Sequence, residues 1–226
     1  MQSARVLFAG CGGLGSNQAK IHQQAGVRQM DIVDHDFVED SNRNRQFFTA
    51  DDVGKPKAHQ VLKNLAPFAV FPTLLRGYCS TFEDWVKQKH KTHYDAIICG
   101  VDSMPTMVAV AKYGLASRST VIFVNVDGSG DACRIFIQRP GAACFACYMP
   151  QALQALPERR SCAPVAAIAD ILHVAVGFSA RAVAGEILGA PIGDYNSRDI
   201  TFTGFDIKKT VKRRPACPLC GSSRPL

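Results

Sequence analysis

Apolar residues in the first part of the chain change from short continuous runs to helical spacing and back. The run over residues 5–9 predicts a buried strand, residues 10–15 a glycine-rich turn, and residues 14–25 a helix that stops at Gly26. Residues 30–33 predict a second strand. A strand, a tight turn, a helix and a strand in this order form a βαβ unit, so the two strands are expected to be parallel.

The same two patterns recur through the rest of the chain. Helical spacing predicts four further helices, over residues 53–65 (with Pro56 near the start), 82–89, 105–118 and 165–188. Apolar, β-rich runs predict six further strands, over residues 70–76, 96–101, 121–126, 133–138, 200–206 and 209–213. Strands that alternate with helices indicate an α/β fold.

Composition favours a single globular domain over residues 1–226. Hydrophobic residues make up 47% of the chain, and no internal repeat, low-complexity tract or linker interrupts them. No apolar run approaches the roughly 18–20 residues of a membrane span. The N-terminus lacks the basic and apolar regions of a secretion signal, so we expect a cytoplasmic protein that does not use a membrane.

The net charge of +7 is concentrated at the C-terminal end of the chain. Residues 207–226 carry six Lys and Arg side chains and no acidic residue, so the rest of the chain is close to neutral. No aromatic residue lies among these cations to stack on bases, which argues against a nucleic-acid partner. A solvated basic tail and a docking site for an acidic partner both stay open.

The glycine turn has the residues needed to approach a nucleotide. Gly10 and Gly12 let the backbone turn sharply and come close to phosphate oxygens, and Gly15 allows the helix to pack closely on the strand. The N-terminus of the following helix offers free N–H groups and the positive end of the helix dipole. Asp34 lies 19 residues after Gly15, where an acid can accept a hydrogen bond from a ribose hydroxyl.

Polar and basic residues follow this acid closely. Asn42, Arg45 and Gln46 come directly after it, and Lys57 lies at a helix start. Cationic side chains in this position can neutralise negative charge that develops on phosphates. Asp102 ends another predicted parallel strand and should face the same crevice, where an isolated carboxylate suits Mg²⁺ bound to phosphate oxygens.

Four of the nine cysteines form two Cys-x-x-Cys pairs, Cys144 with Cys147 and Cys217 with Cys220. In a chain without a secretion signal such pairs favour a metal over disulfides, and their spacing is typical of thiolates on tetrahedral zinc. Four thiolates leave no open coordination position, so we expect a structural zinc that holds the C-terminal tail on the body. Two redox pairs or unrelated thiols are the alternative.

Cys162 is a candidate nucleophile. Arg159 and Arg160 precede it closely, and a predicted helix follows it. Neighbouring cations and a helix N-terminus both lower the pKa of a thiol and favour the reactive thiolate. An unreactive cysteine is an alternative of equal weight.

In this order and spacing, these features resemble the adenylating domain shared by bacterial ThiF, MoeB and HesA proteins and by ubiquitin-activating enzymes. The resemblance covers nearly the whole chain, from about Val6 to Cys220. It rests on Gly10-x-Gly12-Gly13-Leu14-Gly15, Asp34-x-Asp36, Asn42-x-x-Arg45-Gln46, Val53-Gly54-x-Pro56-Lys57, Asp102 and the two cysteine pairs.

The resemblance implies a doubly wound, Rossmann-like sheet that is mostly parallel, with an antiparallel C-terminal part and a zinc-clipped tail. It also implies a homodimeric enzyme that uses ATP to adenylate the C-terminal glycine of a small ubiquitin-like or sulfur-carrier protein. By this analogy Asp34 holds the ribose, and Arg45 and Lys57 contact phosphates. Gln46 orients the phosphates, and Asp102 binds Mg²⁺. The implied nucleotide-binding residues are Gly10, Gly12, Gly13, Gly15, Asp34, Asp36, Asn42, Arg45, Gln46 and Lys57.

Three positions are less settled by the resemblance. Cys162 lies near the place where some relatives carry a cysteine that receives the activated acyl group, whereas other relatives pass the adenylate to a sulfur donor. Relatives usually carry a further N-terminal segment whose Arg reaches the ATP of the partner subunit, and here Arg43 is a candidate substitute. Asp102 is followed by Ser103, where relatives commonly have Asn.

Other functions stay open from sequence alone. The glycine motif by itself also fits an NAD-dependent oxidoreductase, although Lys57 and the cysteine pairs count against it. The lack of the usual N-terminal Arg favours a degenerate scaffold that binds nucleotide or partner without turnover. Adenylating reactions on peptides or modified tRNA are a smaller alternative.

Overall fold

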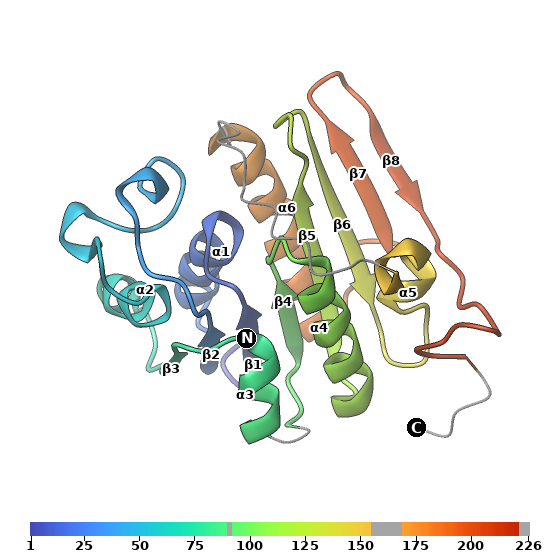
Figure 1. Ribbon diagram of the computed structural model, residues 1–226, viewed down its shortest axis with the longest axis horizontal. Helices are drawn as coiled ribbons and strands as arrows, with labels where there is room; N and C mark the ends of the chain where they lie inside the picture. The colour runs from blue at the N-terminus through green and yellow to red at the C-terminus, as the bar shows by residue number, and fades with distance from the viewer. Residues whose placement is uncertain (90–91, 155–168, 222–226) are drawn as a thin grey trace.

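One sheet organises the part of the chain that the computed structural model describes, residues 1–89, 92–154 and 169–221. Its eight strands lie in the order β3-β2-β1-β4-β5-β6-β7-β8 (Figure 1). The strands are β1 Arg5–Ala9, β2 Gln29–Val33, β3 Leu74–Tyr78, β4 Ala96–Cys99, β5 Thr120–Val126, β6 Ala132–Gln138, β7 Ser197–Thr201 and β8 Asp206–Lys209. The first five strands in this order, from β3 at the edge through β2, β1 and β4 to β5, pair in parallel. β6, β7 and β8 then continue the sheet in antiparallel pairs.

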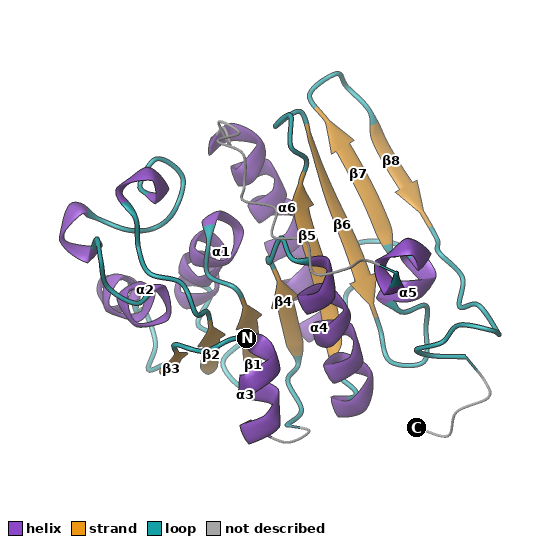
Figure 2. Ribbon diagram, in the orientation of Figure 1, coloured by secondary structure: helices purple, strands orange, loops and turns teal. Residues whose placement is uncertain are grey.

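Helices cover both faces of this sheet (Figure 2). They are α1 Gly13–Gln24, α2 Lys57–Leu65, α3 Phe82–Lys89, α4 Met104–Ser117, α5 Phe145–Tyr148 and α6 Ala169–Ile187, and short 3₁₀ turns occur at Asp40–Asn42, Ala50–Asp52, Ala66–Phe68 and Pro150–Leu153. Residues of α1, α2 and α6 join one hydrophobic core, and residues of α3, α4 and α5 join the other. This is the doubly wound, mostly parallel fold that the sequence predicts. Of the helices described, none is both long and apolar enough to cross a membrane.

The central strands are apolar throughout because both of their faces are buried. In β4, Ala96 and Ile98 belong to the core formed with α1, α2 and α6, whereas Ile97 and Cys99 belong to the core under α3 and α4. None of the four is more than 1% exposed. A continuous apolar run is therefore what a parallel strand covered on both sides requires.

The start of α2 differs from the predicted helix at residues 53–65. Gly54 has a φ of +79°, and Pro56 has a ψ of 125°, so α2 begins only at Lys57. Proline also disfavours helical geometry in the residue before it. The strand predicted at residues 70–76 is likewise displaced, because β3 pairs in parallel with β2 only from Leu74 onward.

The strands predicted at residues 200–206 and 209–213 are both wrong in their bounds. β7 ends at Thr201, and the chain turns back through Gly204, which has a φ of +94°, before β8 begins. Pairing with β6, in which Ala132 lies opposite Thr201, fixes the register of β7. Partners distant in sequence therefore decide these bounds, and the local apolar pattern does not contain them.

We expect the buried His22 of α1 to make folding pH-dependent. Its two ring nitrogens have no hydrogen-bond partner among the described residues, and burial lowers its pKa to about 4. In an unfolded chain the pKa is about 6.5, so the unfolded state gains the proton first as the pH falls. The stabilisation from neutral His22 is therefore complete above about pH 7.5 and decreases as the pH falls through about 6.5. It should fall by about 2.5 kcal/mol between about pH 7.5 and about pH 4.5.

Urea unfolding of the wild type and of His22→Leu near these two pH values measures the effect. On acidification the variant should lose about 2.5 kcal/mol less than the wild type. His59→Leu replaces an exposed histidine on α2 and should keep the full pH dependence of the wild type. Equal pH dependence in the wild type and His22→Leu would show that His22 does not stay neutral in the folded protein.

Candidate functional site

A cleft with a volume of ≈ 940 Å³ opens at the carboxyl ends of the parallel strands. The segments that follow β1, β2, β3 and β4 line it, together with the end of β5. In the sheet, β1 connects through α1 to β2 on one side, and its other neighbour β4 connects through α4 to β5. Connections that diverge in this way leave a crevice between the two strands, which is where α/β folds bind ligands.

The turn between β1 and α1 borders this cleft. Gly10 has a φ of +87°, which glycine adopts without strain, and Gly12 directly precedes α1. A Cβ atom at Gly13 would lie 2.4 Å from Cδ1 of Leu172, and one at Gly15 would lie 2.1 Å from the carbonyl oxygen of Gly10. Gly10, Gly12 and Gly13 line the cleft, whereas Gly15 is required for the packing of α1 against the turn.

Asp34 follows β2, and two backbone N–H groups fix its carboxylate. Its Oδ2 accepts from Cys11 at 2.7 Å, and its Oδ1 accepts from Asp36 at 2.8 Å. Burial and the adjacent Asp34 charge raise the pKa of the Cys11 thiol. Asp34 itself is 9% exposed and lines the cleft, so its oriented oxygens can still meet a ligand hydroxyl.

Lys57, the first residue of α2, also lines the cleft and is only 7% exposed. Its Nζ lies 2.9 Å from Oδ2 of Asp36, and its backbone N–H donates to the Asp36 carbonyl at 2.9 Å. A largely buried ammonium needs such a partner to offset lost hydration. Asp36 therefore positions the Lys57 charge inside the cleft.

Asn42 and Gln46 come to the cleft on the segment after β2. The Asn42 Oδ1 accepts the backbone N–H of Glu39 at 3.1 Å and closes a 3₁₀ turn. Gln46 is buried, and its Oε1 has no hydrogen-bond partner in the described part of the chain. A buried, unpaired amide beside a cleft is available to a ligand or a water molecule.

Arg45 lies between Asn42 and Gln46 in the sequence and also lines the cleft. Its Nη1 donates to the Ser41 carbonyl at 3.0 Å and to Asn44 Oδ1 at 2.9 Å, and its own carbonyl accepts from Asn17 of α1 at 2.9 Å. No carboxylate pairs with its guanidinium within the described ranges. Its charge is therefore available to an anion at the N-terminus of α1.

Asp102 borders the cleft from the β4 side. The next residue, Ser103, caps α4 by accepting the Thr106 N–H at 3.5 Å, which fixes the end of this loop. Asp102 lines the same cleft as Arg45 and Lys57. A single protein carboxylate beside a phosphate site fits Mg²⁺ that is bound mainly through phosphate oxygens.

The sequence patterns missed further residues that line the cleft. They include Ser80, Thr81, Phe82, Glu83, Thr106, Asn125, Val126 and Leu172. The signal that could have found most of them is their place directly after or at the end of a parallel strand, since these ends meet at one edge of the sheet. Leu172 has no such signal, because α6 reaches the cleft only through tertiary packing.

One further sequence candidate does not line this cleft, and another is not described by the structure. Arg43, the candidate substitute for an N-terminal Arg, forms an ion pair with Asp40 and does not line the cleft. Cys162 lies outside the described residues, so its role as a nucleophile stays a prediction.

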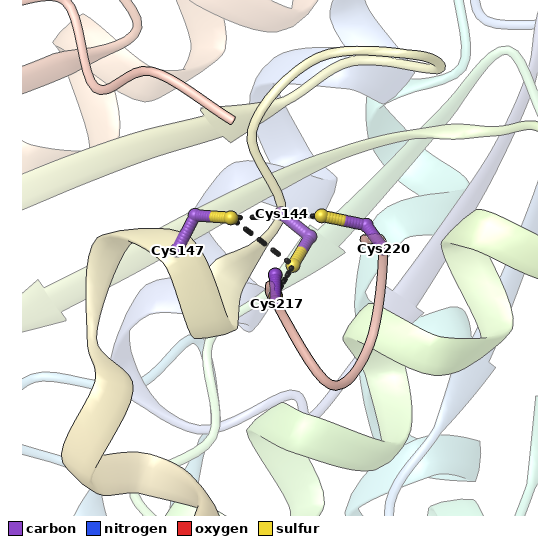
Figure 3. A group of neighbouring side chains, drawn as sticks. All are labelled: Cys144, Cys147, Cys217 and Cys220. Carbon is purple, nitrogen blue, oxygen red and sulfur yellow. Dashed lines mark hydrogen bonds between the residues drawn. The ribbon is translucent and has the colours of Figure 1, made fainter. Parts of the chain in front are cut away.

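The four paired cysteines gather at a second place, in the core under α4 and α5 (Figure 3). All four are buried, and their Sγ atoms lie within 4.8 Å of one another. Cys144 is 3.5 Å from Cys217, Cys147 is 3.5 Å from Cys220, and Cys144 is 3.9 Å from Cys147. The shortest separations cross between the two segments, which disfavours two independent redox pairs.

The cysteine cluster fits a tetrahedral metal ion. Zinc–sulfur bonds of about 2.3 Å place the sulfurs of a regular tetrahedron about 3.8 Å apart, close to the observed separations. Burial raises the pKa of the Cys217 thiol, but backbone hydrogen bonds from Cys220 and Leu219, together with side-chain hydrogen bonds with Cys144 and Cys147, lower it to about 7. This donor set could hold Zn²⁺ with no coordination position left for a substrate.

Comparison with known proteins gives the family. The model of the ThiF family matches residues 1–220 of this chain. The sulfur carrier protein adenylyltransferase of Thermus thermophilus is 28% identical over 98% of this chain and 83% of that protein. Mouse adenylyltransferase and sulfurtransferase MOCS3 is also 28% identical, over 98% of this chain, which spans 48% of that protein.

The fold of this chain also occurs in Escherichia coli MccB. The crystal structure of MccB with ATP superposes with a TM-score of 0.82, at 21% identity, over 97% of this chain and 67% of that one. A likeness at this identity concerns the fold alone, whereas the family match spans the glycine turn, the cleft residues and both cysteine pairs. The chain belongs to the ThiF family.

Proposed function

We propose that residues 1–226 form one adenylation domain, which uses ATP to activate the C-terminal glycine of a small ubiquitin-like or sulfur-carrier protein. The observation that carries this proposal is a single cleft lined by the glycine turn, Asp34, Arg45, Lys57 and Asp102. Relatives in Thermus and mouse are named adenylyltransferases, and the Thermus name includes a sulfur carrier protein.

In the proposed reaction the glycine turn and the N-terminus of α1 bind the phosphates of ATP. The Asp34 carboxylate accepts a hydrogen bond from a ribose hydroxyl. A carboxylate oxygen of the carrier attacks the α-phosphorus, and the bond from that phosphorus to the bridging oxygen breaks. The electron pair leaves with pyrophosphate, and the carrier becomes an acyl-adenylate. Arg45 and Lys57 would stabilise the charge that develops on the phosphate oxygens. Asp102 would hold Mg²⁺, which neutralises phosphate charge when bound.

The proposal also includes a structural zinc ion, a homodimer, a cytoplasmic location and a role for Cys162. The sulfur geometry supports a structural Zn²⁺ held by Cys144, Cys147, Cys217 and Cys220. The resemblance to ThiF, MoeB and HesA proteins supports a homodimer in the cytoplasm. It makes Cys162 the candidate acceptor of the acyl group in those reactions that form a thioester. Light scattering of the purified protein tests the dimer.

Calorimetric titration with MgATP tests the nucleotide part of the proposal. The wild type should bind MgATP and give no heat with NAD⁺, and Asp102→Ala should weaken MgATP binding about tenfold or more while the protein stays folded. The control is Asp131→Ala, which removes an exposed carboxylate from the loop between β5 and β6 and should bind as the wild type does.

Three other results of the titration and of ATP–pyrophosphate exchange would change the proposed function or its residues. Heat with NAD⁺ instead of MgATP would replace adenylation with hydride transfer. MgATP binding without any ATP–pyrophosphate exchange, even with carrier proteins ending in glycine, would favour the nucleotide-binding scaffold. Unchanged binding and exchange in Asp102→Ala would remove Asp102 from the site.

A further inference from the structure

Two basic residues of the C-terminal tail are directed at the cysteine cluster. Arg213 Nε donates to the carbonyl of Cys220 at 2.7 Å, and Arg214 Nη2 donates to the carbonyl of Ala146 at 2.6 Å. The backbone N–H of Arg214 also donates to Sγ of Cys147 at 3.3 Å. Arg213 therefore contacts one cysteine of the cluster, and Arg214 contacts another cysteine and the residue before it.

The hydrogen bonds of Arg213 and Arg214 connect different parts of the cysteine cluster. The Arg213 contact spans the segment from residue 213 to Cys220 and folds the second Cys-x-x-Cys pair into a tight loop. Both Arg214 contacts cross from the tail to α5, which begins directly after Cys144 and contains Cys147. Together they connect two cysteine-bearing segments that are distant in sequence, before any metal ion is considered.

The other cations of the tail behave differently. Lys208 lies 3.5 Å from Asp206, and Lys209 lies 4.0 Å from Asp199, so both have carboxylate partners. Arg213 and Arg214 have none among the described residues, and their side chains end at neutral carbonyl oxygens. Arg213 and Arg214 are both exposed, and no carboxylate of the described residues neutralises their charge, so negative charge of another origin in the adjacent cluster would attract them.

Four thiolates provide that charge. A divalent cation with four Cys thiolates has a net charge of −2, and two guanidinium groups at its border would offset it. Hydrogen-bonding partners outside the ligand set orient ligands and typically change metal affinity by about 10–100-fold. At Arg213 and Arg214 the basic tail would then have a role at the metal site, in addition to being a solvated segment or a docking site elsewhere.

We propose that Arg213 and Arg214 are positioning residues of the metal site: they hold the two cysteine segments in register and compensate the negative charge of the four-thiolate complex. This inference rests on the zinc site given under the proposed function. It assigns residues 213–214 to the metal, and it leaves Lys208, Lys209 and Lys212 as surface cations.

Zinc affinity, measured by competition with a chromophoric chelator, tests the inference. Arg213→Gln and Arg214→Gln keep a polar side chain without the charge, and each should weaken zinc binding about tenfold. Arg213→Lys and Arg214→Lys keep the charge and should recover part of this loss. Lys212→Gln removes an exposed cation from the same tail and should leave the affinity unchanged. The visible spectrum of the Co²⁺-loaded proteins reports in every variant whether the tetrahedral thiolate site is still formed.

The outcomes separate the arginines from the metal site itself. Wild-type protein that contains no zinc, or Cys217→Ser that binds zinc as tightly as the wild type, would overturn both the site and the role of the arginines. A zinc-loaded wild type whose affinity changes less than about twofold in both Gln variants would overturn the arginine role alone. Lys variants as weak as the Gln variants would overturn the charge compensation. If Lys212→Gln lost as much zinc affinity as the Arg→Gln variants, the loss would come from the overall charge of the tail, and the specific role of the two arginines would be overturned.

Discussion

Lys57→Ala is expected to slow carrier-dependent ATP–pyrophosphate exchange by about 10²–10³-fold, with little change in the free energy of unfolding. The Lys57 ammonium lies in the cleft wall, 2.9 Å from Asp36, with only 7% of the residue exposed. A cation held in place by a neighbouring carboxylate does not need to reorganise when phosphate charge develops. Exchange kinetics at several ATP concentrations separate a change in kcat from a change in KM.

Two further variants make this result specific. Lys112→Ala removes an exposed cation from α4 and should exchange at the wild-type rate. Asp36→Asn should produce a smaller loss, about tenfold, because it releases the Lys57 side chain without removing its charge. If Lys57→Ala keeps a rate within about threefold of the wild type, Lys57 does not contact the reacting phosphates.

Gly15→Ala is expected to lower the free energy of unfolding by about 3 kcal/mol and to abolish measurable MgATP binding. The added Cβ would lie 2.1 Å from the carbonyl oxygen of Gly10 and 2.9 Å from its carbonyl carbon. Both atoms belong to the backbone and cannot rotate away. The first turn of α1 would therefore have to move, and it would carry the N–H groups that face the cleft with it.

Gly177→Ala is the matched control. Gly177 lies inside α6, and a Cβ there would have no heavy atom within 4 Å. Alanine should stabilise this position by about 0.5–1 kcal/mol, because it restricts the unfolded chain and favours the helix. Urea unfolding and MgATP titration measure both variants. Wild-type stability in Gly15→Ala would mean that α1 can withdraw from the turn without cost.

The parallel half of the sheet was predictable because its signals are local. β1 and α3 have the bounds that the apolar pattern predicts, and the acid after β2 and the carboxylate after β4 both line the cleft. Asp34 and Asp102 are 68 positions apart in the chain, but a parallel sheet brings the carboxyl ends of its strands to one edge. Once the strands were predicted, their meeting place followed.

The antiparallel half was predicted less well. Residues 200–206 contain one local turn signal, Gly204, which the strand prediction did not use, and pairing of β7 with β6 supplies the register that no local signal contains. Leu172 of α6 likewise has no local pattern that assigns it to a ligand site, whereas the cleft residues at the start of α3 have only their place after a parallel strand as a signal.

The amino-acid sequence by itself determined the βαβ start, the glycine turn, most of the polar residues that line the cleft after β2, and the two cysteine pairs, because each is a contiguous pattern with its own chemistry. Only the tertiary structure decided which cysteines approach one another across the chain, that Asp36 holds Lys57, and that Arg213 and Arg214 reach the cysteine cluster. These contacts join residues of distant segments. Their partners are selected by how the sheet and helices pack, which no local pattern encodes.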